Sequence, residues 1–440
     1  MATCQVNKID SNIVGLRVAE EECLKQLPEV VGDIVWNPLE PNGYKDFGVQ
    51  TSMVARNPIN PSRQRQKGIV TGLEASVGFG LDFVYAEQKR LLPGMMFAAI
   101  HRPAAPMVTV TAPTVTIVDG MMRLASDDLD DVVSEIRTGD WLFLGDAAGR
   151  FVEDGNNGFK RVRAIVPGAL VFDKGIEKAE AEVLAGGLSV YIPATLRNES
   201  GSDIVRTSYQ FERTLGSLDG LDPPQAEYVT GAVPSTYALN MPTADKITTD
   251  FTYTACNGEL RTQTDGLKPG TRPTLPDADA YNTSTDLKRV VMSRVRTGVA
   301  APLPLFGFLL ESTLNINNKL AGNKALGVVG NFDITAGTFE VSISATAYFS
   351  DVDAIRAVHE NADITLDYLL MKNGQAIMFD LPMLALGDGR PAVELDQPIT
   401  LPLTGDAATA KKLGDDFNYT LNVNFFDALP PLAAALYDTE

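Results

Sequence analysis

A strand pattern that passes directly into a helix pattern occurs in GIVTGLEASVGFGLDFVYAEQKRLLPGMM (Gly68–Met96) and again in NFDITAGTFEVSISATAYFSDVDAIRAVHENA (Asn331–Ala362). In each stretch, apolar residues alternate with small or polar residues before the helical spacing begins. Alternation with a period of two is typical of a β-strand that buries one face. The sequence therefore predicts one strand–helix unit that occurs twice in the chain.

The segments after the two helices also correspond, in pattern and not in residue identity. Each copy continues with three β-like segments: TSYQFERTL, EYVTGAVPSTYALNM and KITTDFTYTA (207–215, 227–241 and 246–255) in the first, and ITLDYLLM, QAIMFDLPMLALG and DFNYTLNVNFF (364–371, 375–387 and 416–426) in the second. Duplicated units of this size commonly build pseudo-symmetric rings or arrays. The repeat thus favours a protein that assembles.

A segment with no counterpart in the second copy interrupts the first. It runs from about His101 to Ile204 and contains short strand patterns separated by turns, whereas the second helix is followed almost at once by the strand at Ile364. An insertion at such a point is expected to project from the surface. The predicted fold is mainly β, with two tandem β-sandwich or barrel units, each with a flanking α-helix, and an inserted small β-rich domain.

The predicted domain boundaries follow from these patterns. Residues 1–100 begin the first unit, with an amphipathic N-terminal stretch expected to be a helix or arm and a long loop at 36–67. The inserted domain then occupies 101–204, the rest of the first unit 205–262, a linker rich in Pro, Thr and Asp 263–300, and the second unit 301–440.

The composition limits the possible classes of protein. A chain of 440 residues with 45% hydrophobic residues is long enough for two or three folded domains, and no apolar run approaches the roughly 20 residues that span a bilayer. Three widely spaced cysteines form neither a disulfide framework nor a zinc motif. The N-terminus lacks the pattern of a secretory signal, so we expect a protein of cytoplasmic origin with no membrane partner.

The formal net charge of −19 bears on nucleic acids. A surface this acidic repels phosphates, which argues against DNA binding. Two interpretations of the charge remain open. It either serves solubility alone or suits a channel through which DNA slides without binding.

The sequence carries no recognisable catalytic motif. Of the two histidines, His359 lies in the second helix without ligands at metal spacing, and His101 has no obvious orienting partner for a general base. The carboxylates of Asp127–Asp131 are more simply explained as first-turn acids of a short helix than as calcium ligands. No GxSxG elbow, Walker loop or dinucleotide fingerprint is present. No catalytic, cofactor-binding or metal-binding residue is therefore predicted, and nothing supports an enzyme.

The long loop at 36–67 contains four prolines and a basic cluster near its end, formed by Arg56, Arg63, Arg65 and Lys67. Loops of this length without secondary structure are uncommon in compact domains and are usually functional. Two interpretations remain open: a mobile surface excursion, or a segment that docks on an acidic face of a neighbouring subunit.

With these patterns, the chain resembles the major tail tube proteins of long, non-contractile-tailed (siphovirus-type) bacteriophages. The resemblance covers most of the chain outside the insertion. It is carried by four motifs: NKIDSNIVGLRVAEE (Asn7–Glu21), ARNPINPSRQRQKG (Ala55–Gly68), GLEASVGFGLDF (Gly72–Phe83), and YQFERTL paired with EYVTGAVPSTYALNM (Glu227–Met241).

The resemblance implies β-sandwich units with a flanking helix, whose inner sheets join into rings that stack into a hollow tube in the virion tail. DNA would leave the capsid through this tube without specific binding. The tape measure protein in the lumen, and the tail-tip and tail-terminator proteins, would be further partners. The long loop would reach an adjacent ring, which makes Arg56, Asn57, Arg63, Arg65 and Lys67 the expected inter-ring contacts.

Relatives with one unit per chain form hexameric rings, so two units per chain predict a trimeric ring with pseudo-sixfold symmetry. The alternative is a hexamer in which the second copy is not a true tube unit. Other functions also remain open. They are a tail-tip or baseplate ring protein of the same fold, a non-viral β-sandwich protein whose insertion binds a glycan, and, last, an enzyme of unrecognised type.

Overall fold

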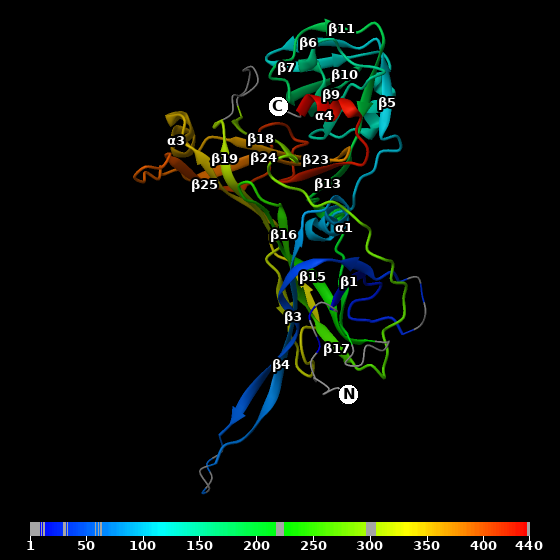
Figure 1. Ribbon diagram of the computed structural model, residues 1–440, viewed down its shortest axis with the longest axis vertical. Helices are drawn as coiled ribbons and strands as arrows, with labels where there is room; N and C mark the ends of the chain where they lie inside the picture. Colours follow the sequence, from blue (N-terminus) through cyan, green and yellow to red (C-terminus); the bar gives the residue numbers. More distant parts are fainter. Residues whose placement is uncertain are drawn as a thin grey trace, which may run out of the picture.

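The computed structural model describes residues 9, 11, 14–29, 32, 34–57, 59, 61, 64–216, 224–295 and 305–437. It contains two adjoining β-sandwich units, the first below the second in Figure 1, and a separate β-domain above the second unit. The mainly β fold predicted from strand alternation is confirmed.

One continuous antiparallel sheet runs through both units. We call it the inner sheet. Its strands lie in the order β3 (Pro41–Arg56), β4 (Gln66–Asp82), β16 (Thr248–Ala255), β15 (Gln225–Met241), β19 (Leu309–Asn317), β22 (Glu340–Tyr348), β25 (Thr400–Ala407) and β24 (Gln375–Asp388). The first four strands belong to the first unit and the last four to the second.

Each unit adds an outer sheet that packs on the inner one. In the first unit it consists of β2 (Asn37–Leu39), β1 (Gly15–Glu20), β14 (Tyr209–Gly216), the first half of β15 and β17 (Asn257–Arg261). In the second it consists of β18 (Leu287–Arg294), β23 (Ile364–Lys372), the first half of β24, β26 (Asn422–Phe426) and β13 (Ala194–Arg197). Because β15 and β24 each serve two sheets, they close the sandwich.

The core between the sheets is a single apolar cluster shared by both units. The rings of Phe79, Phe211, Phe251 and Tyr253 meet in the first unit at centroid separations of 4.8 to 6.0 Å. Helix α1 (Tyr85–Met96) is largely buried between the units, and α3 (Val352–His359) flanks the second (Figure 1). Burial of alternate strand residues gives the period of two seen in the sequence.

The inserted domain forms its own eight-stranded sheet and core. Its strands are β5 (Met107–Thr111), β6 (Thr114–Val118), β7 (Met121–Ala125), β8 (Trp141–Leu144), β9 (Gly158–Val166), β10 (Ala169–Lys174), β11 (Glu182–Val183) and β12 (Gly187–Tyr191), with a short helix α2 (Leu129–Val132). A last helix, α4 (Pro431–Tyr437), and a ribbon of β20 (Ala321–Asn323) with β21 (Asp333–Thr335) complete the α-helices and strands of the described residues.

Three local expectations differ from the structure. The amphipathic N-terminal stretch, expected to be a helix or arm, contains strand β1, because its apolar side chains Leu16 and Val18 alternate into the core. Most of 36–67 is not a structureless loop but the long hairpin β3–β4, paired as far as Arg56 with Gln66. The end of the expected linker, from Leu287, forms strand β18.

Candidate functional site: open strand edges and a polar sheet face

The two units repeat in the same direction along the inner sheet. The pairing of β3 with β4 skips one residue between Pro41 and Gly43, and the pairing of β19 with β22 skips one between Leu309 and Glu311. The ladders β14–β15 and β23–β24 share a second irregularity, because each skips a residue after its first pair. Such register shifts are specific backbone features, so they identify β3 with β19, β4 with β22, β14 with β23 and β15 with β24.

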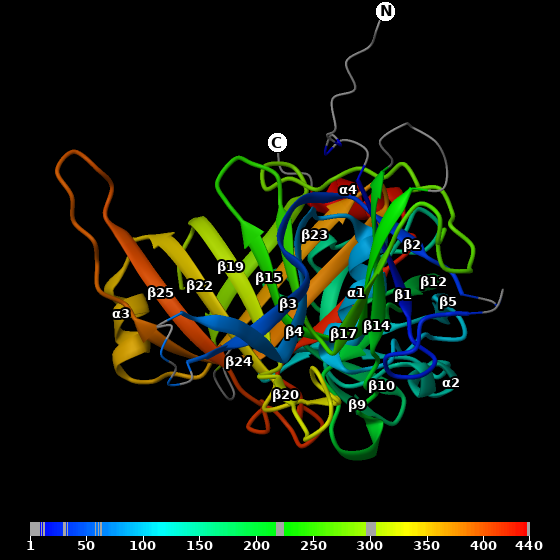
Figure 2. The same cartoon turned by 90° about the horizontal axis from the view of Figure 1, so that it is seen from below.

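The units therefore join head to tail, through β15 of the first and β19 of the second. Six residue pairs, from Thr236 with Asn317 to Met241 with Ser312, form this junction. In Figure 2 the strands β4, β15, β19, β22 and β25 follow one another across a single curved surface. A head-to-tail junction leaves one free edge of each kind at the ends of the sheet.

These two free edges are complementary. Among the described residues, β3 pairs only with β4, and the last part of β24, Ala385–Asp388, pairs only with β25. Since β3 is the equivalent of β19 and β24 that of β15, the two edges repeat the strands that already pair inside the chain. An exposed edge presents unpaired N–H and C=O groups to another strand.

The face of the inner sheet that points away from the core is lined by small polar side chains. In β16, Thr249, Phe251, Tyr253 and Ala255 are buried, whereas the alternate residues are partly exposed. The partly or fully exposed residues of the central strands on this face are Thr248, Asp250, Thr252 and Thr254 of β16, Thr236, Ala238 and Asn240 of β15, Glu311, Thr313, Asn315 and Asn317 of β19, and Glu340, Ser342, Ser344, Thr346 and Tyr348 of β22. Hydroxyl and amide groups therefore dominate this surface.

Charges on the same face are mostly acidic or paired. Lys45 lies 2.8 Å from Asp250, and Lys319 lies 3.0 Å from Glu340. The carboxylate of Asp406, also exposed, adds a further negative charge. A surface of this kind offers little attraction to phosphates.

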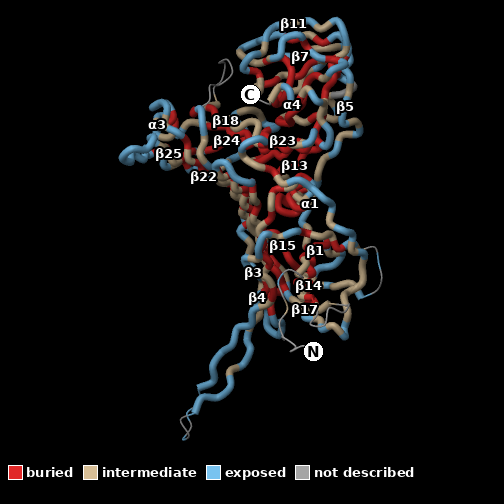
Figure 3. Tube along the Cα trace, in the orientation of Figure 1, coloured by how far each residue is buried: buried red, intermediate tan, exposed pale blue. Residues whose placement is uncertain are grey.

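The basic residues predicted for inter-subunit contact lie far from the core, on the distal part of the β3–β4 hairpin. Arg56, Asn57, Arg65 and Lys67 are exposed there, and Arg63 lies outside the described residues. Figure 3 shows the hairpin leaving the body as two exposed strands. Because strands this exposed bury neither face, they lack the alternation that would have predicted a hairpin.

The inserted domain packs on the outer sheet of the second unit. Apolar side chains of β8 and β9 form one cluster with β23, β24, β26 and α4; the buried members are Trp141, Phe143, Phe159, Leu369, Met371, Ala376, Met378, Phe426 and Ala433. After the inserted domain, β13 pairs with β26 and so extends the sheet of the second unit. The insertion thus leaves the first unit and covers the second.

Ion pairs buried in this contact were not predicted from the sequence. Arg161, only 2% exposed, lies 3.1 Å from Asp380 of the second unit and 2.8 Å from Asp173 of its own domain. Burial alone would lower the pKa of Arg161, but these two carboxylates raise it above its ordinary value. The guanidinium therefore stays charged and links the domains.

A second buried acid, Asp367 on β23, receives Arg289 at 2.6 Å and an ion pair from Lys174 of the inserted domain. Although burial favours the neutral acid, these two cations hold the pKa of Asp367 below its ordinary value. These charged residues come together only in the folded structure, and no sequence motif relates them.

The structure also describes the residues considered for catalysis. No group of three His, Cys, Asp or Glu side chains suited to a metal ion occurs in the described part of the chain. The backbone of His101 bridges Thr195 where the insertion begins and ends, and His359 is exposed at the last residue of α3. Among the helices that the structure describes, none is long and apolar enough to cross a membrane.

Comparison with known proteins agrees with the sheet geometry. A family model described as phage tail tube protein matches residues 11–407, which is nearly the whole chain. No curated protein matches the chain as a relative. The family consists of structural proteins of the phage tail that assemble with one another, and it is not a known class of enzymes. The chain belongs to the phage tail tube protein family.

Proposed function

We propose that the protein is the major tail tube subunit of a siphovirus-type phage, in which three chains close into a ring of pseudo-sixfold symmetry. The observation that carries the proposal is the head-to-tail repeat of the inner sheet. In the ring, β24 of one chain pairs with β3 of the next, as β15 pairs with β19 within the chain. Gly387 and Asp388 would then face Gln50 and Val49, the equivalents of the internal pairs.

The alternative hexamer would need twelve units in the ring, or a second unit turned away from it. The shared apolar core and the six-pair junction between the units argue against the second arrangement. In a trimer the inserted domain, proposed at 101–204, decorates the outside once per chain, because it covers an outer sheet and not the inner one.

In such a ring the polar face of the inner sheet lines the lumen. Hydroxyl, amide and carboxylate groups there support passage of DNA without binding, since few unpaired cations are available for phosphates. The tape measure protein would occupy this lumen before ejection. Tail-tip and tail-terminator proteins would bind the two ends of the tube, and synthesis would take place in the host bacterial cytoplasm.

The β3–β4 hairpin is proposed to contact the adjacent ring through Arg56, Asn57, Arg63, Arg65 and Lys67. Deletion of residues 57–67 should leave a folded subunit that forms rings and fails to stack them. Tubes of normal length from this variant would contradict the assignment of the hairpin.

Electron microscopy of the purified protein over a concentration series, with and without tail-tip complexes as seeds, tests the proposed function. We expect hollow, striated tubes. Rings that never stack, even with seeds, would instead favour a tail-tip or baseplate protein of the same fold.

A further inference from the structure

Two extensions of the inner sheet lie at opposite ends of its strands. The sheet is antiparallel, so the turn between β3 and β4 and the connection between β19 and β22 lie at one rim. The turn between β15 and β16 and the connection between β24 and β25 lie at the other rim. In a stack of rings these two rims would meet.

The first extension is the distal β3–β4 hairpin. Residues 51–73 contain Arg56, Arg63, Arg65 and Lys67 and no Asp or Glu. The hairpin also exposes apolar side chains that no part of the described chain covers, with Met53 at 67% and Ile69 at 56% exposure. A segment that is both basic and apolar is suited to an acidic surface with apolar contacts.

The second extension is the connection between β24 and β25, residues 389–399, which we call the acidic loop. It carries Glu394 and Asp396, follows Asp388, and contains Arg390 as its one basic residue. It also exposes Val393 and Leu395, the latter at 90%. Charge and apolar surface therefore occur together here as they do on the hairpin, with the opposite sign.

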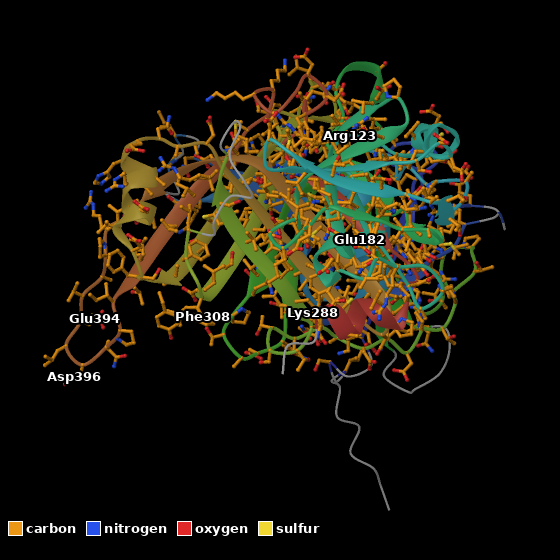
Figure 4. All side chains as sticks on the ribbon, turned by 90° about the horizontal axis from the view of Figure 1, so that it is seen from above. Arg123, Glu182, Lys288, Phe308, Glu394 and Asp396 are labelled. Carbon is orange, nitrogen blue, oxygen red and sulfur yellow. The ribbon has the colours of Figure 1, made fainter. Side chains whose placement is uncertain are left out.

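An aromatic side chain extends this surface. The N–H of Tyr348 donates to the carbonyl of Phe308, and the N–H of Phe349, directly after β22, donates to the carbonyl of Ile399 at the end of the acidic loop, so these segments are neighbours. Phe308 is 76% exposed. Figure 4 shows Phe308, Glu394 and Asp396 along one edge of the molecule, where their side chains point outward.

The geometry points to a docking site for a second copy of this chain: we propose that the acidic loop, with Phe308, receives the β3–β4 hairpin of a subunit in the adjacent ring. Only the second unit offers this site, since the β15–β16 connection of the first unit spans only residues 242–247. Each chain thus supplies one hairpin and one receptor. This inference rests on the proposed ring, and it adds the surface that the β3–β4 hairpin contacts in the adjacent ring.

Charge reversal tests the receptor. The variant Glu394→Lys/Asp396→Lys should form rings of normal mass, while the protein concentration needed for tubes rises about tenfold or more, because like charges would face each other. The control Glu153→Lys/Glu180→Lys reverses two exposed acids of the inserted domain and should assemble like the natural chain. Adding Arg56→Glu/Arg65→Glu to the receptor variant should restore tubes.

Three outcomes would overturn the inference alone, and a fourth would overturn it together with the proposed function. Tubes of the receptor variant at the natural concentration would exclude the acidic loop as the receptor and leave the ring proposal intact. Loss of the rings themselves would place the loop within a ring. If the fourfold variant forms rings but no tubes, the acidic loop contacts a surface other than the hairpin. If the natural chain forms no rings under any condition, the proposed function fails together with the receptor.

Discussion

The two tube units have the same β-sandwich architecture, but different segments of the chain cover their outer sheets. Glu212 on β14 and Asp367 on β23 occupy equivalent positions, since each follows the same register shift by one residue, and both are fully buried. Glu212 binds Arg272 of the inter-unit segment at 2.6 Å and Arg17 of β1 at 3.5 Å. Asp367 binds Arg289 of β18 and Lys174 of the inserted domain.

A buried carboxylate at the equivalent position thus forms an ion pair with a different covering segment in each unit. The outer sheet of the first unit, which includes its own N-terminal strand β1, is covered by the segment between the units. The second is covered by a domain that is inserted in the first. The comparison teaches that the inner sheet is the shared part of the duplicated unit, while the outer surface has diverged around a common anchor.

Proline substitution at equivalent positions of the internal strand β19 and the edge strand β3 should have the largest effect, on stability in the first case and on ring formation in the second. The N–H of Asn318 donates to Ser235 of β15 at 2.9 Å, and by alternation the N–H of Ile316 also faces β15. Ile316→Pro removes a ladder hydrogen bond and most of a buried side chain, so it should destabilise the fold by about 3 kcal/mol or more. Val49→Pro, at the equivalent position of the free strand β3, should leave a folded monomer that does not form rings.

Thermal unfolding by circular dichroism and size-exclusion chromatography measure these two results. Val49→Thr, which keeps the N–H and the β-branched side chain, is the matched control and should form rings. If Val49→Pro forms rings of normal size, the β3 edge is not the site of ring closure.

Neutralising the buried carboxylates Asp367 and Glu212 should have the next largest effect on the free energy of unfolding, and the loss should differ between the two units. Asp367→Asn leaves Lys174, 3% exposed, without a full counter-charge, so a cost of about 3–5 kcal/mol is expected. Glu212→Gln should cost about 1–3 kcal/mol, because Arg17 and Arg272 are 26% and 20% exposed and solvent compensates in part. Chemical denaturation of both variants measures the difference; equal costs would contradict it.

The inserted domain should make stability depend on pH through Lys160. Burial lowers the pKa of Lys160 from 10.5 to about 7, with Arg289 acting in the same direction and Glu177 opposing it. Between these values the unfolded chain binds more protons than the folded one, so stability rises with pH. The slope contributed by one such group is at most about 1.4 kcal/mol per pH unit.

Lys160→Met should therefore be more stable than the natural chain at pH 7, with a smaller advantage at pH 9. Denaturation at both pH values measures the slope. The exposed Lys178→Met in the same domain is the control and should leave the slope unchanged. A slope that persists in Lys160→Met would assign the effect to another group.

The equivalent helices α1 and α3 differ in their N-caps, and removing the cap of α3 should have the smallest effect on stability. In α3 the Asp351 side chain accepts a hydrogen bond from the Asp353 N–H at 3.1 Å, whereas the N-cap residue of α1, Val84, makes no side-chain hydrogen bond and the helix is held by burial. Asp351→Ala should cost about 1 kcal/mol, and Asp351→Asn should cost less, because Asn also caps. Equal losses in the two variants, measured by thermal unfolding, would exclude the cap as the cause.

The sequence predicted those parts of the fold in which one strand face is buried. The alternation in Gly68–Gly80 and the helix after it match β4 and α1, and the second copy matches β22 and α3. The third segment was assigned wrongly. The sequence paired KITTDFTYTA with 416–426, but the equivalent of β16 in the inner sheet is β25, Thr400–Ala407, in which the Pro, Gly and Asp weaken the strand signal.

The interfaces were harder to predict, for physical reasons. Basic residues in the hairpin were visible as a cluster, but the acidic loop has too few charges to stand out in a chain of this net charge. The buried pairs have no common spacing in the sequence: Arg161 and Asp380 are 219 positions apart, whereas Arg161 and Asp173 are 12 apart, so the spacing carries no signal. Alternation also gave each strand two faces, and only packing showed which one is the core.

The number of chains per ring tests the central claim most directly. Native mass spectrometry of isolated rings, together with rotational averaging of end-on electron micrographs, measures it. We predict a mass of three times the 47.3 kDa chain, an inner wall of apparent sixfold symmetry and three peripheral densities from the inserted domains. A ring of six chains with six such densities would contradict head-to-tail closure by the duplicated sheet.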